Sequence, residues 1–200
     1  MSISQPRLDS VCVFCGSSNA ADPALLAAAA SLGSLLAGDH VRLVYGGGGV
    51  GLMGACARAA HAGGGRVLGV IPEFLTHIEQ APGGAQTVVV GSMHERKMRM
   101  FTEADGFAVL PGGIGTLEEV IELLSWRRLG LHSKPIVFYN PGGFWTPLFV
   151  LFDRFIGQNL LPGAFADCWR AVTTVEEILP TLRSLPRMPF PPIQGAASTV

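Results

Sequence analysis

The chain has 200 residues, of which 48% are apolar and only 14% charged, and its net charge is −1 at pH 7. This length and composition fit one domain with a sizeable buried core. The near-zero charge argues against a broad nucleic-acid-binding surface, which needs a basic excess. The start of the sequence lacks a basic stretch followed by an apolar run, so we expect no signal peptide, and no apolar run reaches the roughly 20 residues that cross a bilayer. We therefore expect a cytoplasmic protein whose phosphate sites, if any, are local.

The four cysteines do not suggest a disulfide framework or a zinc site. Cys12 and Cys15 form a CxxC pattern, but on a strand two residues three positions apart point to opposite faces of the sheet. No second CxxC completes a set of zinc ligands. We expect Cys12, Cys15, Cys56 and Cys168 to be small buried side chains in a reducing compartment.

Short β-branched runs alternate along the chain with longer helical patterns, which is typical of parallel βαβ units. In chain order, the pattern predicts a strand at 11–14, a helix at 23–37, a strand at 41–45, a helix at 52–61, strands at 66–71 and 86–90, a helix at 92–104, a strand at 107–110, a helix at 116–128, a strand at 135–139, a helix at 144–158, a strand at 169–172 and a helix at 174–185. Asp22 is the expected N-cap of the first helix, and Gly38 lies near its end. The pattern predicts a doubly wound, Rossmann-like, mostly parallel sheet with helices on both faces.

We expect a single domain with short extensions at both ends. Residues 1–8 form the N-terminal extension, and residues 9–185 form the nucleotide-binding catalytic domain. Residues 186–200 contain four prolines and then small polar residues. Such a segment buries too little apolar surface to order itself, so we predict a disordered tail.

Three glycine-rich turns follow three of the predicted strands. They are Gly16-Ser17-Ser18, residues 46–54 and residues 111–116. In a doubly wound sheet, ligands bind outside the carboxyl ends of the strands, so all three turns are expected at one edge. Glycine allows the backbone to approach a ligand closely, and the helix that follows offers free N–H groups to an anion. Three such turns together favour a nucleotide-sized anionic ligand, although each turn alone has a purely steric explanation.

The second turn contains a GxGxxG match at residues 49–54, with Glu73 about twenty residues further on. This spacing is that of the dinucleotide fingerprint. The fingerprint, however, belongs to the first βα turn of a Rossmann fold, and here it follows the second strand. An NAD-dependent oxidoreductase is therefore a minor alternative.

The third turn, Pro111-Gly112-Gly113-Ile114-Gly115-Thr116, is followed by Leu117, Glu118 and Glu119. We expect Thr116 to start the helix and to present its hydroxyl and nearby N–H groups to a phosphate. Glu119 would then lie in the first turn, near a sugar whose 5'-phosphate sits in the loop. Thr116-x-x-Glu119 is also a capping box, as are Ser92-x-x-Glu95 and Thr173-x-x-Glu176, so the spacing leaves both roles open.

The predicted helix at 92–104 begins with His94-Glu95-Arg96-Lys97. Two cations near a helix N-terminus oppose the dipole by a few tenths of a kcal/mol, and such a cluster is usually a solvated face. Beside phosphate loops it gains a second interpretation, because arginine binds phosphate or carboxylate through two parallel hydrogen bonds. The remaining histidines lack metal-ligand spacing, and we interpret them as surface or structural residues: His40, His61, His77 and His132.

Together, residues 93–97 (MHERK) and 111–119 (PGGIGTLEE) resemble the LONELY GUY (LOG) family of cytokinin riboside 5'-monophosphate phosphoribohydrolases, whose members were formerly described as possible lysine decarboxylases. The resemblance covers residues 9–185. Further matching segments are Gly16-Ser17-Ser18, residues 45–54, residues 70–72, Trp126 with Leu129-Gly130, and Lys134-Pro135.

The resemblance implies hydrolysis of AMP or an N6-substituted AMP, such as isopentenyl-AMP, to the free base and ribose 5-phosphate. Arg96 and Glu119 would be the catalytic pair, with Glu119 stabilising an oxocarbenium-like transition state. Arg96 would neutralise the phosphate, or position Glu119 and lower the pKa of its carboxyl. The family also implies a homodimer with active sites near the subunit interface. We expect no metal or cofactor, because the glycine loops, helix dipoles and Arg96 supply the positive field. The implied substrate-binding residues are Gly16, Ser17, Gly47, Gly48, Met53, Glu79, Lys97, Gly112, Gly113, Ile114, Gly115, Thr116, Leu117 and Glu118.

The same residues bear on two other functions, a lysine decarboxylase and a carrier protein. A lysine decarboxylase would need a Schiff-base lysine for pyridoxal phosphate, and only Lys97 and Lys134 exist. Lys134 precedes a strand proline and Lys97 lies beside Arg96, so we expect no decarboxylase. A carrier of a nucleotide or of molybdenum cofactor on the same fold has no need for the pair Arg96 and Glu119. That pair therefore favours an enzyme over a carrier.

Overall fold

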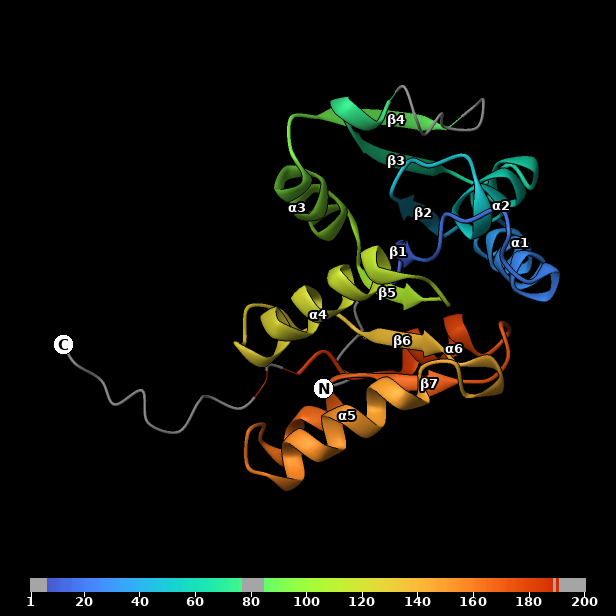
Figure 1. Cartoon of the computed structure of the whole chain (residues 1–200). Helices are drawn as coiled ribbons and strands as arrows, with labels where there is room; N and C mark the ends of the chain where they lie inside the picture. Colours follow the sequence, from blue (N-terminus) through green and yellow to red (C-terminus); the bar gives the residue numbers. More distant parts are fainter. Residues whose placement is uncertain (1–6, 77–84, 189, 191–200) are drawn as a thin grey trace, which may run out of the picture.

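The computed structural model describes residues 7–76, 85–188 and 190. These residues contain one seven-stranded sheet with the order β4-β3-β2-β1-β5-β6-β7, and every strand pairing in it is parallel (Figure 1). The strands are β1 (Ser10–Phe14), β2 (Arg42–Tyr45), β3 (Val67–Pro72), β4 (Gln86–Val90), β5 (Gly106–Val109), β6 (Ile136–Tyr139) and β7 (Arg170–Val172). The predicted strands are thus confirmed within one or two residues at each end.

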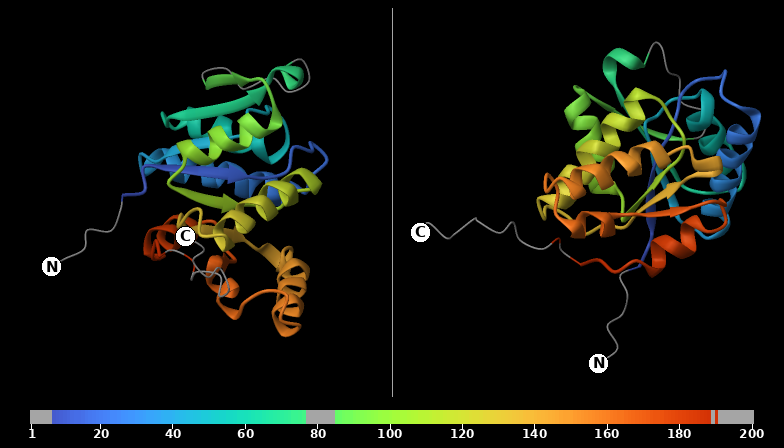
Figure 2. Two further views of the ribbon diagram at one scale, coloured as in Figure 1. Left: turned by 90° about the vertical axis from the view of Figure 1, so that its left-hand side faces the viewer. Right: turned by 60° about the horizontal axis from the view of Figure 1, so that its bottom comes forward.

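Helices cover both faces of the sheet, which confirms the predicted three-layer α/β fold (Figures 1 and 2). A separate apolar cluster lies between the sheet and the helices on each face. One cluster packs α1, α2 and α6 against the sheet, and the other packs α3, α4 and α5 against it. The helices are α1 (Pro23–Gly38), α2 (Gly51–Ala62), α3 (Met93–Glu103), α4 (Ile114–Arg128), α5 (Thr146–Gly157) and α6 (Ile178–Ser184), with short 3-10 turns η1 (Glu73–Leu75), η2 (Pro141–Gly143) and η3 (Gly163–Cys168). None of these helices is long and apolar enough to cross a membrane.

The strand order reverses at β1. The chain runs from β1 outward through β2, β3 and β4, and then returns to place β5 on the other side of β1. Cys12 in the middle of β1 therefore lies opposite Val44 of β2 and Phe107 of β5. A crevice opens at such a switch point, outside the carboxyl ends of the central strands.

All four cysteines are buried and unbridged, as predicted. Cys12 belongs to the cluster beneath α3, α4 and α5, whereas Cys15 belongs to the cluster beneath α1 and α2. The two thiols of the CxxC pattern thus point to opposite faces of the sheet. Burial raises the pKa of each of the four thiols, that of Cys56 to about 12.

Two of the predicted helix caps are confirmed, and the one predicted for α6 is not. Asp22 accepts a hydrogen bond from the N–H of Ala24, and Ser92 Oγ accepts one from the N–H of Glu95, as predicted. The predicted capping box between Thr173 and Glu176 is wrong. Glu177 Oε2 instead accepts from the N–H groups of Thr173 and Thr174, because the intervening turn brings both amides to that carboxylate and delays α6 to Ile178.

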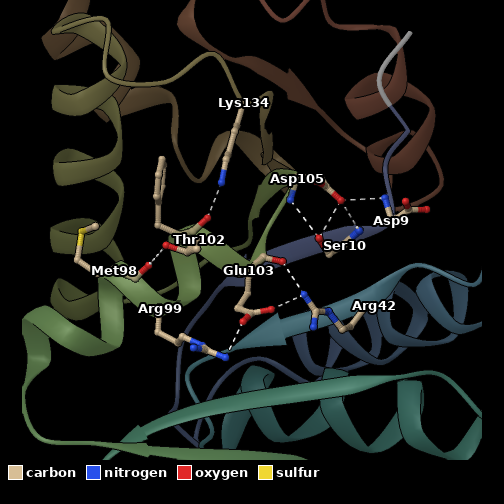
Figure 3. Close-up of polar contacts among 10 residues, drawn as sticks. Asp9, Ser10, Arg42, Met98, Arg99, Thr102, Glu103, Asp105 and Lys134 are labelled. Atoms are coloured by element: carbon tan, nitrogen blue, oxygen red, sulfur yellow. Dashed lines mark hydrogen bonds and ion pairs between the residues drawn. The ribbon is translucent and has the colours of Figure 1, made fainter. Parts of the chain in front are cut away.

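The C-terminal end of α3 is bound by two cations (Figure 3). Arg42 Nη2 donates to the carbonyl of Glu103 at 2.8 Å, and Lys134 Nζ donates to the carbonyl of Phe101 at 2.6 Å. Positive side chains suit this end of a helix, because its last carbonyls lack partners and carry partial negative charge. These bonds anchor α3, which carries Arg96 near its other end, to the amino ends of β2 and β6.

The described start of the predicted tail lies against the body of the protein. Arg127 Nη1 donates to the carbonyl of Met188 at 2.7 Å, and the side chain of Phe190 packs against the cluster beneath α4 and α5. Residues 189 and 191–200, like residues 1–6, lie outside the described part of the chain. Disorder of residues 189 and 191–200 stays a prediction.

Candidate functional site

The three glycine-rich turns meet at one edge of the sheet, as predicted, and Gly16 joins them. Its N–H donates to the carbonyl of Pro111 at 3.1 Å. Its carbonyl accepts from the N–H groups of Leu52 at 3.0 Å and Met53 at 3.3 Å. The turn after β1 is thus hydrogen-bonded to the start of α2 and to the turn after β5.

A cavity of about 530 Å³ opens where these turns meet, at the switch point of the sheet. Its lining includes eleven of the predicted site residues: Gly16, Ser17, Met53, Arg96, Gly112, Gly113, Ile114, Gly115, Thr116, Glu118 and Glu119. It also includes eight residues that were not predicted: Cys15, Ser18, Ala21, Leu25, Leu52, Met93, Pro111 and Phe144. The cavity thus brings Arg96 from α3 together with Glu119 from α4.

Helix α4 begins at Ile114, two residues before the predicted start at Thr116. Thr116 is therefore the third helical residue, it is buried, and Glu119 lies in the second turn. Of the two roles that the spacing left open, the capping box of Thr116 and Glu119 is contradicted, because the N-cap of α4 is Gly113, which has no side chain to cap the helix. The first N–H groups of α4 have no carbonyl one turn earlier to bond, and they face the cavity as a place for an anion.

The N-terminus of α2, which carries the GxGxxG match, is already occupied. The N–H of Gly51 donates to Asn19 Oδ1 at 2.9 Å, and those of Leu52 and Met53 donate to Gly16 as described above. Gly47 has a φ of +81° and lies against Ile71 of β3; neither Gly47 nor Gly48 lines the cavity. Because a dinucleotide pyrophosphate would need those N–H groups, this helix end does not support NAD binding.

Arg96 is 7% exposed and extends across the end of β2. Its Nη2 donates to the carbonyl of Gly46 at 2.6 Å, and its buried Nε has no acceptor among the described residues. A Cβ atom at Gly46 would lie 2.2 Å from Nη2, so only glycine leaves room for the guanidinium here. The sequence alone gave no reason to pair Gly46 with Arg96, fifty residues away.

Lys97 does not line the cavity; it joins α3 to α4 instead. Its Nζ pairs with Glu118 Oε1 at 2.5 Å and with Glu122 Oε2 at 2.9 Å, and its side chain is 14% exposed. Burial alone would lower the pKa of Lys97, but the bonds to both glutamates outweigh burial and raise it. Leu117 also lies outside the lining, and Glu79 falls outside the described residues.

Phe144 is the most informative of the residues that sequence reasoning missed. It follows η2, after β6, and 44% of its surface is exposed at the cavity. Its ring contacts Trp145 edge to face at 4.9 Å between centroids. Gly142 and Gly143 directly precede it, in a further glycine turn that follows a strand, and this turn was the available signal in the sequence. The placement of β6 beside β5 brings the residue to the site.

Both lysines are engaged in bonds, and neither lines the cavity. Lys134 Nζ, besides its bond to Phe101, lies 4.1 Å from the centre of that ring. Within residues 7–76, 85–188 and 190, no cluster of three metal-ligating side chains is present.

The fold and the site define an α/β protein of the Rossmann type, with an uncapped helix N-terminus at the switch point of its sheet. The model of the family described as possible lysine decarboxylase matches residues 53–182. The probable cytokinin riboside 5'-monophosphate phosphoribohydrolase LOGL9 of Oryza sativa subsp. japonica is 45% identical over 161 residues, 80% of this chain and 71% of the relative. The Arabidopsis thaliana enzyme LOG7 is 41% identical over 162 residues, 80% of this chain and 75% of the relative.

This chain belongs to the LOG family. Its relatives are named phosphoribohydrolases, that is, enzymes that cleave N-glycosidic bonds, and not lysine decarboxylases. Among solved structures, the molybdenum cofactor carrier protein of Chlamydomonas reinhardtii superposes with a TM-score of 0.69 at 19% identity, covering 90% of this chain and 98% of the carrier. The molybdenum cofactor binding protein of Rippkaea orientalis gives a TM-score of 0.66 at 23% identity, covering 89% and 97%. At these identities, the two structures show a shared fold alone.

Proposed function

We propose that this protein hydrolyses the N-glycosidic bond of a purine nucleoside 5'-monophosphate, AMP or an N6-substituted AMP, to the free base and ribose 5-phosphate. The observation that carries the proposal is the cavity shared by the uncapped N-terminus of α4, Arg96 and Glu119. Its volume of about 530 Å³ lies within the usual range of ligand pockets, roughly 300–1,000 Å³. The named activity of the family supports the same reaction.

In this proposal the 5'-phosphate binds the N–H groups at residues 112–116, where the dipole of α4 favours negative charge. The bond between C1' and the base nitrogen breaks through an oxocarbenium-like state, which the carboxylate of Glu119 stabilises. Water then supplies a hydroxyl to C1' and a proton to the departing base. No metal is required, because the helix end and Arg96 supply the positive field.

Arg96 is proposed to act from a fixed position. Nη2 donates to the carbonyl of Gly46 and Nη1 to Met93 Sδ, which leaves Nε and the remaining N–H groups for the phosphate or for Glu119. Lys97 is proposed as a positioning residue, in place of the predicted substrate contact. By binding Glu118 and Glu122 it ties the helix of Arg96 to the helix of Glu119.

The base is proposed to lie along the apolar part of the lining. Leu25 of α1, Leu52 and Met53 of α2, and Phe144 provide aliphatic and aromatic surface within the same cavity. Such surface suits a flat purine and an apolar N6 substituent, because burying apolar area contributes about 25 cal/mol per Å². Gly47, Gly48, Leu117 and Glu79 are not needed for this placement.

We also propose that the protein is a homodimer through α4 and α5. A groove of about 350 Å³ between these helices is lined mainly by apolar side chains, among them Ile121, Leu124, Phe155 and Leu160. Ile121 is 39% exposed and Leu160 is 64% exposed. Exposed apolar surface of this kind marks interaction sites, and light scattering of the purified chain tests it.

The reaction is tested by incubating the purified protein with AMP and with isopentenyl-AMP and following base release by chromatography. Release of base and ribose 5-phosphate in equal amounts is expected. Folded protein that releases no base from either nucleotide contradicts the proposal. Strong thermal stabilisation by a nucleotide or a pterin without any product would favour the carrier alternative.

A further inference from the structure

A second cavity, of about 330 Å³, lies at the opposite edge of the sheet from the candidate active site. It opens where β6 and β7 begin, and the segment after α6 closes one side of it. Three cations and one carboxylate contribute to its wall: Arg127, Lys134, Arg170 and Asp167. The other lining residues are mostly apolar: Pro135, Ile136, Ala164, Cys168, Leu185, Pro186, Met188 and Phe190.

Arg127 is a buried cation without an acidic partner. It is 9% exposed, and its Nη1 donates to the carbonyls of His132 at 2.9 Å and Met188 at 2.7 Å. Its Nε is buried and has no acceptor among the described residues, and none of their ion pairs includes it. Burial lowers the pKa of Arg127. An unpaired buried charge is costly, so the guanidinium favours an anion beside it.

The neighbouring charges do not neutralise Arg127. Asp167 is 77% exposed at its side chain and meets Arg170 Nη2 only at 3.5 Å. Asp105, which faces Lys134, is bound by two N–H groups and by Ser10 Oγ. Arg187 adds a further positive charge near Lys134 and lowers its pKa, to which burial contributes most. The region therefore carries more positive than negative charge around an apolar floor.

We propose that this cavity binds a small organic anion, a carboxylate or phosphate monoester with an apolar body. The anionic group pairs with Arg127 and Arg170, and the apolar body packs on Ile136, Leu185 and Phe190. A guanidinium pair suits either oxyanion, because each guanidinium presents parallel N–H donors. The site is separate from the catalytic cavity and does not depend on the proposed reaction.

The test is an amide NMR titration of the full-length, ¹⁵N-labelled protein with benzoate and, separately, with phenyl phosphate. Saturable shifts are expected at residues 168–170 and 185–188, and the tighter of the two probes identifies the anionic group. Arg170→Ala should weaken that binding about tenfold, the effect of one charged hydrogen bond. Arg154→Ala, which removes an exposed arginine of α5, should leave it unchanged.

Arg127→Met, checked for folding by circular dichroism, should abolish the shifts; if that variant does not fold, Arg170→Ala decides. The proposal is overturned if neither probe gives saturable shifts at this cavity, or if Arg170→Ala binds as tightly as the unaltered protein. Shifts confined to residues 112–116 also overturn it, while leaving the proposed phosphate loop of the catalytic cavity supported.

Discussion

Gly46→Ala offers the most direct test of how Arg96 is held. The new Cβ would lie 2.2 Å from Arg96 Nη2, whereas ordinary contacts begin near 3.4 Å, so the guanidinium must withdraw by about 1.2 Å. Because the atom in the way is the far end of a flexible side chain, the fold tolerates the change and Arg96 moves. The displaced group loses its 2.6 Å bond to the carbonyl of Gly46.

A hydrogen bond from a charged group contributes about 1.5–3 kcal/mol, which corresponds to roughly 10- to 150-fold in rate. A displacement of about 1 Å at a catalytic group has a similar effect. We therefore expect kcat/KM for base release to fall about 10- to 150-fold in Gly46→Ala, with little change in Tm. Gly38→Ala is the matched control, since a Cβ there meets nothing within 4 Å at the end of α1.

A double-mutant cycle with Arg96→Ala separates this mechanism from a general distortion. If Gly46→Ala acts through Arg96, adding it to Arg96→Ala should lower kcat/KM by less than a further factor of about three. Folded Gly46→Ala protein with an unaltered kcat/KM would refute the reasoning. The reasoning would also be refuted if kcat/KM of the double mutant fell below that of Arg96→Ala by the full factor seen for Gly46→Ala alone.

Three further predictions follow from single residues. Glu119→Gln should keep nucleotide affinity, measured by calorimetry, within about threefold but lose on the order of a hundredfold in turnover; an unaltered turnover would remove Glu119 from the chemistry. Lys97→Met removes the two bonds that tie α3 to α4, so kcat for base release should fall about 10- to 100-fold while circular dichroism shows an unaltered fold. Lys97→Arg should restore kcat, and an unaltered kcat in Lys97→Met would contradict the positioning role. Burial lowers the pKa of His132 to about 4. In the unfolded chain the pKa of His132 is near 6.5, so below that pH the unfolded chain binds a proton that the folded protein does not. The free energy of unfolding is therefore unaffected by His132 above about pH 6.5 and falls as the pH is lowered toward 4. Urea unfolding should show a loss of about 2 kcal/mol between pH 7 and pH 4.5 that is absent in His132→Gln, and an equal loss in that variant would contradict the assignment.

Much of the fold follows from the sequence because its signals are local. β-branched runs such as the one in β1 and the Ala- and Leu-rich pattern of α1 reflect the backbone preferences and face periodicities of short segments. Asp22 and Ser92 cap their helices through contacts two or three residues away, and these were predicted correctly. Where a cap depended on how the preceding loop turned, as at α4 and α6, the predicted start was two to four residues off.

The glycine turns were also visible in the sequence, and the parallel βαβ pattern placed them at one edge. The residues that hydrogen-bond to each turn could not be identified from the sequence, because they lie far from it along the chain. Asn19 caps α2 across thirty-two residues, and Gly46 accepts from Arg96 across fifty. Nothing in the local composition of either segment specifies such a contact.

The sequence by itself determined the class of fold, the edge of the sheet at which the candidate cavity opens, and the glycine turn at residues 112–116 that lines it. Only the tertiary structure decided that Arg96 is fixed by Gly46, that Lys97 binds Glu118 and Glu122, and that Phe144 reaches the cavity. The physical reason is the range of the interactions. Propensity, periodicity and capping act within a few residues, whereas the order of the strands sets which side chains of distant segments meet.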